Sequence, residues 1–211
     1  MIGPVYANNG APGPATGRQC FNGAAAVGDA SGRYTEMAWQ GAMFGACEQA
    51  GVAPGTALGT TALLALYNPV DSGKLLEVIH VGLGYISGTL GAGTVFIAIP
   101  AAFSATAPSS GTSLTVYKNR VGHQARPASA AAVGVVRSNC TVPAAPVARR
   151  PLCSLQASLA STAVAPWMVW ADVGGAFVIE PGHYFQLQSI AAGGSSPLVA
   201  PSVEWNELLL T

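Results

Sequence analysis

The residues with the clearest potential for chemistry form the short stretch Glu180-Pro181-Gly182-His183. A carboxylate and an imidazole three positions apart could act as an acid–base pair or as two ligands of a metal ion. Proline, however, presets φ at position i+1 of a type II turn, and glycine supplies the positive φ that position i+2 needs. We therefore predict that Pro181 and Gly182 form a structural turn with Glu180 and His183 as its hydrated corners.

A metal centre at this turn would need further ligands. The other histidines are His80, inside an apolar run, and His123, and the sequence has none of the His-x-His pairs that cupin enzymes use. The glycine-rich stretches 82–88 and 88–94 lack the spacing of a dinucleotide-binding loop and the lysine of a phosphate-binding loop. No Gly-x-Ser-x-Gly motif marks a nucleophilic serine. We therefore expect no bound metal, no cofactor and no enzymatic activity.

Acidic residues offer little more, because the nine Asp and Glu are scattered over predicted strand ends and loops. Isolated carboxylates in such places are usually solvated. We expect this of the two possible acid–base pairs, Asp172 with Glu180 and Glu204 with Glu207.

The composition limits the partners that this chain can have. Of its 211 residues, 50% are hydrophobic and only 9% are charged, with nine Lys and Arg balancing nine Asp and Glu. A typical domain has about 25% charged residues. Zero net charge argues against a nucleic-acid partner, because nucleic-acid binding requires a basic face. Scarce charge favours either a membrane protein or a subunit whose surface is covered in a permanent assembly.

A membrane-spanning helix is the less favoured of these two alternatives. Residues 81–103 are uncharged and long enough to cross a bilayer. The segment nevertheless contains clustered glycines and β-branched residues, which favour turns and strands, and no Lys/Arg cluster flanks it. We expect no membrane association and no nucleic-acid partner.

Four cysteines are present: Cys20, Cys47, Cys140 and Cys153. None forms a Cys-x-x-Cys pair of the kind found in zinc sites. Because the first 20 residues show no signal peptide, we expect free, buried thiols rather than two disulfides.

The pattern of apolar residues predicts an all-β fold. Expected strands cover 62–68, 74–87, 94–103, 112–119, 166–173, 176–180, 183–190 and 198–209, and a strand or strand pair is expected over 33–44. In the long segment 74–87, strict alternation places Leu76, Val78 and His80 on one face and Ile79 and Val81 on the other. Short strands separated by Gly and Pro, without βαβ alternation, predict an antiparallel β-sandwich or a jelly-roll-like domain.

The domain organisation follows from changes in composition along the chain. Residues 1–32 are rich in Gly, Ala, Pro and Asn and predict an extended N-terminal arm. Residues 33–211 form the predicted sandwich, and the Ala/Pro/Ser-rich stretch 124–166 is expected to be a loop-rich insertion with one short strand near Val135.

A second structural turn is predicted between the first two strands of the sandwich. Asn68-Pro69 begins the connection and Gly73 ends it, with residue types suited to a tight turn. Three tryptophans, Trp167, Trp170 and Trp205, lie near strand ends, where they could belong to the core or anchor an interface between subunits.

Three stretches of the sequence resemble small virion proteins of tailed bacteriophages. They are Tyr67 to Leu76, which contains Asn-Pro and Ser-Gly-Lys, then Ile179 to Leu187, which contains Pro-Gly-x-Tyr, and finally Val203 to Glu207, which contains Trp-x-Glu. Neither the arm nor the segment 124–166 takes part in this resemblance. The motifs encode turns and strand ends rather than a reaction.

The resemblance implies a jelly-roll-like β-sandwich located on or in a virion, often as a homotrimer. We therefore expect a capsid decoration (cement) protein that binds the major capsid protein or another virion protein. A tail, portal-proximal or fibre-anchoring protein of the same fold is the alternative, and a carbohydrate-binding module or a cupin-like enzyme is a more distant one.

Overall fold

A computed structural model describes residues 18–19, 25–26, 34–102, 105–119, 132–155, 168–191 and 194–210. The chain divides into two compact units, residues 1–36 and 37–211. In the first unit, β1 (Arg18–Gln19) pairs antiparallel with β2 (Ala25–Ala26). The rest of the arm predicted over residues 1–32 lies outside the described residues.

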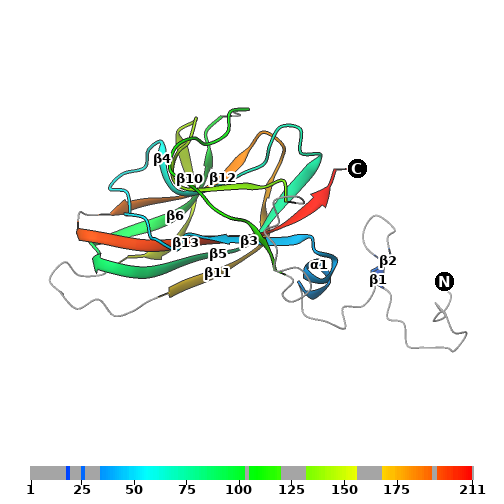
Figure 1. The fold of residues 1–211 in the computed structure, drawn as a ribbon, viewed down its shortest axis with the longest axis horizontal. Coiled ribbons are helices and arrows are strands. Elements are labelled where there is room, and N and C mark those ends of the chain that lie inside the picture. Colours follow the sequence, from blue (N-terminus) through cyan, green and yellow to red (C-terminus); the bar gives the residue numbers. More distant parts are fainter. Residues whose placement is uncertain are drawn as a thin grey trace, which may run out of the picture. The chain divides into compact units, whose positions relative to one another are not determined.

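Two antiparallel sheets pack together in the second unit (Figure 1). In the described part of the chain, the six-stranded sheet has the order β10-β6-β12-β4-β9-β7 and the five-stranded sheet the order β11-β5-β13-β3-β8. The prediction of an all-β sandwich is therefore confirmed. The bounds of the strands are Met43–Cys47 (β3), Thr61–Tyr67 (β4), Lys74–Thr89 (β5), Gly93–Pro100 (β6), Thr112–Ser113 (β7), Tyr117–Lys118 (β8), Val135–Thr141 (β9), Pro146–Ser154 (β10), Met168–Ile179 (β11), Tyr184–Ala191 (β12) and Ser195–Leu209 (β13).

Eight of the strands are connected as in a jelly roll. Along the chain, β3, β4, β5 and β6 lie alternately in the five-stranded and the six-stranded sheet. β10 lies in the six-stranded sheet, as β6 does, and β11, β12 and β13 then alternate between the sheets again. The result is a four-strand set β11-β5-β13-β3 that faces a four-strand set β10-β6-β12-β4. Strands β7, β8 and β9 extend the two sheets at their edges.

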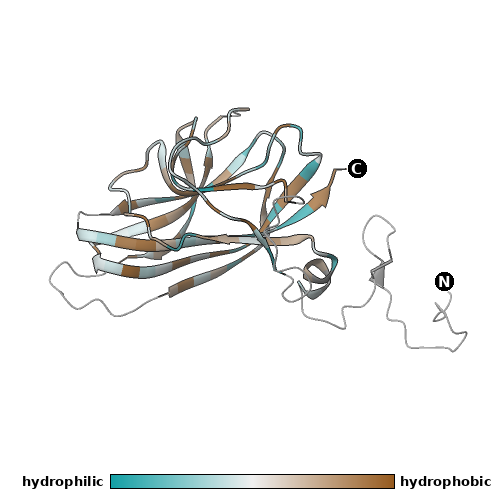
Figure 2. Cartoon of the chain, viewed as in Figure 1, coloured by the Kyte–Doolittle hydropathy of each residue, from teal (hydrophilic) through white to brown (hydrophobic). Residues whose placement is uncertain are grey.

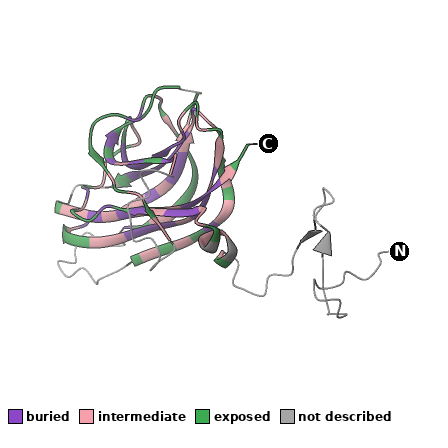
Figure 3. Cartoon of the chain, turned by 45° about the vertical axis from the view of Figure 1, so that its right-hand side comes forward, coloured by how far each residue is buried: buried purple, intermediate pink, exposed green. Residues whose placement is uncertain are grey.

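The hydrophobic core lies between the inner faces of the two sheets. Its largest side chain is Trp205, which is 0% exposed and stacks on Phe44 with ring centroids 6.0 Å apart. Phe177 and Phe185 make an edge-to-face contact between the sheets at 5.8 Å. Apolar residues recur along the strands of both sheets (Figure 2), and buried positions concentrate in the strands, whereas many loop positions and much of the edge strands are exposed (Figure 3).

A β-bulge at Ile79 overturns the alternation predicted for β5. Val78 pairs with Trp205 and His80 pairs with Glu204, so that Ile79 has no partner opposite it on β13. One extra residue reverses the faces of everything beyond it. Five residues of β5 consequently pack in or against the core, on both sides of the bulge: Leu76, Val78, Val81, Leu83 and Tyr85. The two-face assignment from the sequence is wrong beyond this point.

The segment 33–44 forms a helix and the start of one strand instead of a strand pair. Helix α1 covers Thr35–Gln40 and β3 begins at Met43. Glu, Met, Ala and Gln all have good helix propensity, which favours this outcome. Gly41, with φ of 73°, ends the helix by donating its backbone N–H to the Ala38 carbonyl at 3.0 Å.

Two strands, β9 and β10, lie within the stretch 124–166 that was expected to be mostly loop. β9 confirms the one short strand expected near Val135, whereas the loop expected over residues 146–154 is wrong because β10 lies there; residues 124–131 and 156–166 lie outside the described residues. β10 borders only β6, which makes it an edge strand and lets it tolerate Pro146 and Pro151. The single strand predicted over 112–119 is likewise two short ones, β7 in one sheet and β8 in the other.

The cysteines in the described residues, Cys47, Cys140 and Cys153, are all free. Cys140 is buried, and burial raises the pKa of both Cys140 and Cys153 to about 11. Cys47 departs from the expectation of a buried thiol because it is exposed. Cys20 lies outside the described residues.

Candidate functional site

The two predicted turns lie against each other at one end of the sandwich. His183 donates its backbone N–H to the Glu180 carbonyl at 3.1 Å, and Gly182 has φ of 81°, the geometry of a type II turn. The Gly182 N–H donates in turn to the Asn68 carbonyl at 2.8 Å, and the Asn68 N–H donates to the His183 carbonyl at 2.9 Å. The connection between β4 and β5 is thus hydrogen-bonded to the connection between β11 and β12.

Asn68 is the buried link in this arrangement. It is 0% exposed, and its side-chain amide donates to the carbonyls of Lys74 at 2.7 Å and Ile179 at 2.9 Å. Pro69 follows it in the turn, and Gly73 has φ of 63°, a value that favours glycine. The predicted residues Asn68, Pro69 and Gly73 therefore shape the backbone here and present no reactive group.

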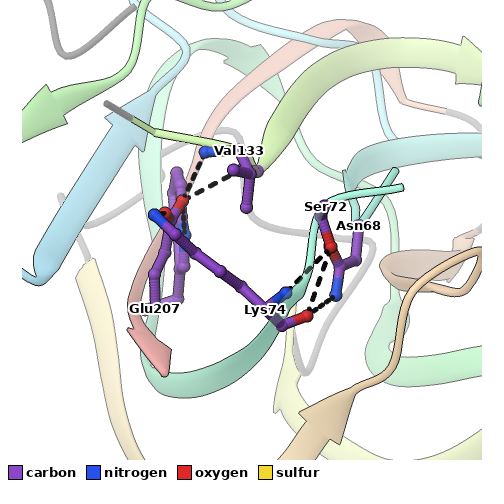
Figure 4. A network of polar contacts seen from close by, with 7 residues as sticks. Asn68, Ser72, Lys74, Val133 and Glu207 are labelled. Atoms are coloured by element: carbon purple, nitrogen blue, oxygen red, sulfur yellow. Dashed lines mark hydrogen bonds and ion pairs between the residues drawn. The ribbon is translucent and has the colours of Figure 1, made fainter. Parts of the chain in front are cut away.

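The third motif stretch joins the same end of the fold through an ion pair (Figure 4). Lys74 Nζ lies 2.8 Å from Glu207 Oε2, and the Glu207 side chain is only 1% exposed, so the expectation of a solvated Glu207 is wrong. Its other oxygen, Oε1, accepts hydrogen bonds from the backbone N–H groups of Val133 at 2.8 Å and Gly134 at 3.1 Å and from Trp205 Nε1 at 3.3 Å. The three stretches that resemble virion proteins, 67–76, 179–187 and 203–207, are therefore linked by one network of hydrogen bonds and an ion pair, which has a structural role.

The two candidate anchor tryptophans in the described residues differ in burial, because Trp205 is in the core and Trp170 is exposed. Trp205 is a core residue, so the alternative that it anchors an interface is wrong for this chain. Trp170 is 51% exposed on the outer face of β11, whereas Trp167 lies outside the described residues.

A groove of about 690 Å³ runs over the outer face of the five-stranded sheet. Strand register places residues from several strands in rows across this face. Trp170 lies opposite Gly82, and Gly82 lies opposite Ser202. Because Gly82 has no side chain, the Trp170 ring can lie against it, and a Cβ at that position would be 3.0 Å from Trp170 Cε3.

Polar groups form the neighbouring row of the groove. His80 Nδ1 lies 2.8 Å from Glu204 Oε2, and Asn119 Nδ2 donates to Glu204 Oε1 at 2.9 Å. The His80 ring also packs against Trp170 at 5.0 Å between centroids. These contacts fix Trp170 and Glu204 in place, although a quarter of the Glu204 side chain remains exposed.

The walls of the groove come from its two sides. Met168 and Trp170 of β11 form one wall, and Tyr117 of β8, which is 47% exposed, stands on the other. Of the residues that line the groove, the sequence singles out Trp170 as a possible interface anchor, Glu204 as a solvated acid and Cys47 as a thiol, but it does not place them together. Only the strand register, which short-range patterns do not reveal, brings Tyr117, Asn119 and Glu204 to the same face.

A smaller cavity of about 200 Å³ borders the Glu180–His183 turn. Both Glu180 and His183 line it, beside apolar residues such as Phe177. His183 Nδ1 lies 3.2 Å from the Pro181 carbonyl, within its own turn. In the described ranges, no three His, Cys, Asp or Glu side chains gather as a metal site would require, and no helix is long and apolar enough to cross a membrane.

A buried carboxylate joins the two sheets between two residues that line the groove, Cys47 and Gln49. Glu48, directly after β3, accepts hydrogen bonds from Ser138 Oγ of β9 and from the Ala50 N–H at 2.8 Å. Burial alone would raise the pKa of Glu48, but the hydrogen bonds from Ser138 and from the backbone outweigh it and lower the pKa. Such a carboxylate acts as a structural cap.

Comparison with protein families, with characterised proteins and with solved structures found no match to this chain.

Proposed function

We propose that this protein is a structural virion protein, a capsid decoration protein that forms homotrimers and binds the assembled head of a tailed bacteriophage. The observation that carries the proposal is the amount of apolar surface in a chain with few charges. Large apolar side chains are exposed at Val70, Ile86, Tyr117, Val135, Val147, Met168, Trp170, Val178, Ile190, Leu209 and Leu210. Association with other subunits would remove such surface from water, worth about 25 cal/mol per Å² before the costs of association.

Three of these residues lie close to the β4–β5 turn. Val70 belongs to the turn, Leu209 pairs with Lys74, and the Leu210 N–H donates to the Gly73 carbonyl at 3.0 Å. Leu209 is 75% exposed. We call Val70, Leu209 and Leu210 the apolar end patch and assign it to the trimer interface. The jelly-roll topology and the convergence of the three resembling stretches beside this patch support the proposal.

The oligomeric state tests the first half of the proposal. Light scattering after size-exclusion chromatography should give a trimer at about 10 µM, a concentration at which stable interfaces remain formed. Val70→Lys combined with Leu209→Lys should shift the protein toward monomer, because each buried ammonium would lack a partner. Ile190→Lys, on an exposed position of β12, is the matched control and should remain trimeric. A monomeric wild-type protein would contradict this half.

Binding to heads tests the second half. Residues 1–32 have a composition that cannot form a core, and we assign part of the head contact to them. A variant lacking residues 1–30 should stay trimeric but co-sediment less with phage heads stripped of this protein. Undiminished co-sedimentation of the deletion variant would exclude the arm as a contact. Failure of the full chain to co-sediment at all would overturn the decoration role.

A further inference from the structure

The geometry points to a second function that does not depend on the proposed one: the groove on the outer face of the five-stranded sheet binds a neutral oligosaccharide, with Trp170 as the stacking platform. The groove lies across β11, β5, β13 and β3. Three inter-strand spacings correspond to about 14 Å, which is room for a short oligosaccharide. Its volume of about 690 Å³ is also in the range of small-molecule sites.

Trp170 supplies the apolar half of such a site. Sugars present C–H groups on one face of each pyranose ring, and these groups pack favourably on the electron-rich face of an aromatic ring. Trp170 is 51% exposed, yet the His80 ring at 5.0 Å and the backbone of Gly82 hold it from behind. A ring that is already fixed loses little conformational entropy when a ligand stacks on it.

Glu204 and Asn119 supply the polar half. Glu204 Oε1 accepts a hydrogen bond from Asn119, and Glu204 Oε2 is hydrogen-bonded to His80 Nδ1. Each carboxylate oxygen can accept a second hydrogen bond, here from a sugar hydroxyl. Ser202 and Gln49 add further hydrogen-bonding groups to the lining. Among the described lining residues, none is Lys or Arg, and a carboxylate is present. This charge pattern matches a neutral polyol and disfavours phosphorylated or carboxylated ligands.

Gly84 keeps the floor of the groove open beside Trp170. It lines the groove opposite Ala200, and a Cβ at this position would meet only the Ala200 Cβ, at 3.9 Å. A larger side chain would thus fit the strand while occupying the space that the ligand needs. Gly84→Val therefore tests occupancy of the groove without removing any of its binding groups.

The experiment is a screen of the full-length protein on an array of neutral bacterial and plant oligosaccharides, followed by calorimetry with the best ligand. Trp170→Ala should raise the Kd about tenfold or more, and Gly84→Val should have a similar effect. Val178→Ala, an exposed apolar residue of the same strand outside the groove, is the control and should bind as the wild type does. Circular dichroism and the unfolding midpoint establish that each variant is folded.

Two outcomes would overturn the assignment: the wild-type protein retains no sugar on the array, or a retained sugar binds Trp170→Ala and Gly84→Val with unchanged Kd. If the wild type binds no sugar and Trp170→Ala changes the oligomeric state, the groove is a contact between subunits instead. Trimer formation and head binding are measured separately, so that failure here is distinguishable from failure of the decoration role.

Discussion

The side-chain amide of Asn68 donates a hydrogen bond to the backbone carbonyl of Ile179 at 2.9 Å, across 111 positions of sequence. The same amide donates to the carbonyl of Lys74 at 2.7 Å. One buried side chain thereby satisfies the backbone of two separate connections. This explains why an asparagine stands at the start of the β4–β5 turn.

Asn68→Ala should destabilise the fold by about 1–3 kcal/mol, because it leaves two carbonyl groups without their donor. Urea unfolding should show a lower midpoint at an unchanged slope. Asp71→Ala, at an exposed position of the same turn, is the control and should have little effect. Equal midpoints for the two variants would show that the Asn68 amide is not needed.

Gly182→Ala should cost about 1–2 kcal/mol, because residues with a Cβ resist the left-handed region. The φ of 81° at Gly182 is fixed by its hydrogen bond to Asn68 and by the turn itself. Gly59→Ala is the matched control, because Gly59 has no heavy atom within 4 Å of an added Cβ and no positive φ. Thermal unfolding of both variants measures the difference, and a Gly182→Ala midpoint equal to the control would refute the strain argument.

Lys74→Met should lower stability by about 2 kcal/mol or more, because it leaves the buried Glu207 carboxylate without its counter-charge. Methionine retains much of the apolar stem, so that packing changes little. Lys118→Met removes the other lysine of the chain and serves as control. Adding Glu207→Gln to Lys74→Met should recover part of the loss in urea unfolding. No recovery would mean that packing, and not charge, sets the cost.

Stability should fall in acid partly through Glu48. Its pKa is lowered in the folded state, so its contribution is fully present above the ordinary glutamate pKa of about 4.3 and is lost as the pH falls through the lower folded value. Ser138→Ala removes one of the hydrogen bonds responsible, and should flatten the dependence of unfolding free energy on pH between about 5 and 3. The control is Ser113→Ala, at an exposed position on β7. A steep dependence that Ser138→Ala leaves unchanged would assign the acid effect to other groups.

Sequence patterns predicted the strands whose two faces differ clearly in polarity or whose ends carry turn residues. β4, β5, β6, β12 and β13 are of this kind, and the turns at Asn68 and Gly182 follow from residue types that few other conformations suit. β10 was missed because an edge strand exposed along much of its length has no apolar alternation, and it contains Pro146 and Pro151. The bulge at Ile79 was missed because it depends on pairing with β13, which local sequence does not encode.

The groove was beyond sequence analysis for a related reason. Trp170, Glu204 and Tyr117 come from three strands that are far apart in the sequence, and only their register brings them to one face. The sequence identifies Trp170 as a candidate anchor. Whether its side chain points to the core or to solvent depends on which of the two alternating faces of β11 it occupies, and the sequence does not fix this. Trp205 shows the opposite outcome, since its side chain faces inward.

The position of β13 has a consequence for how the protein is made. This strand lies between β5 and β3 and pairs with both, although it comes last in sequence among the described strands. While the ribosome is still translating the preceding residues, the two strands on either side of the gap have unpaired edges and cannot close the sheet. Non-local closure of this kind is slow, and open edges attract other chains. We expect the sandwich to form only after residue 209 has left the ribosome, because β3 and β5 cannot be joined into one sheet before β13 is available.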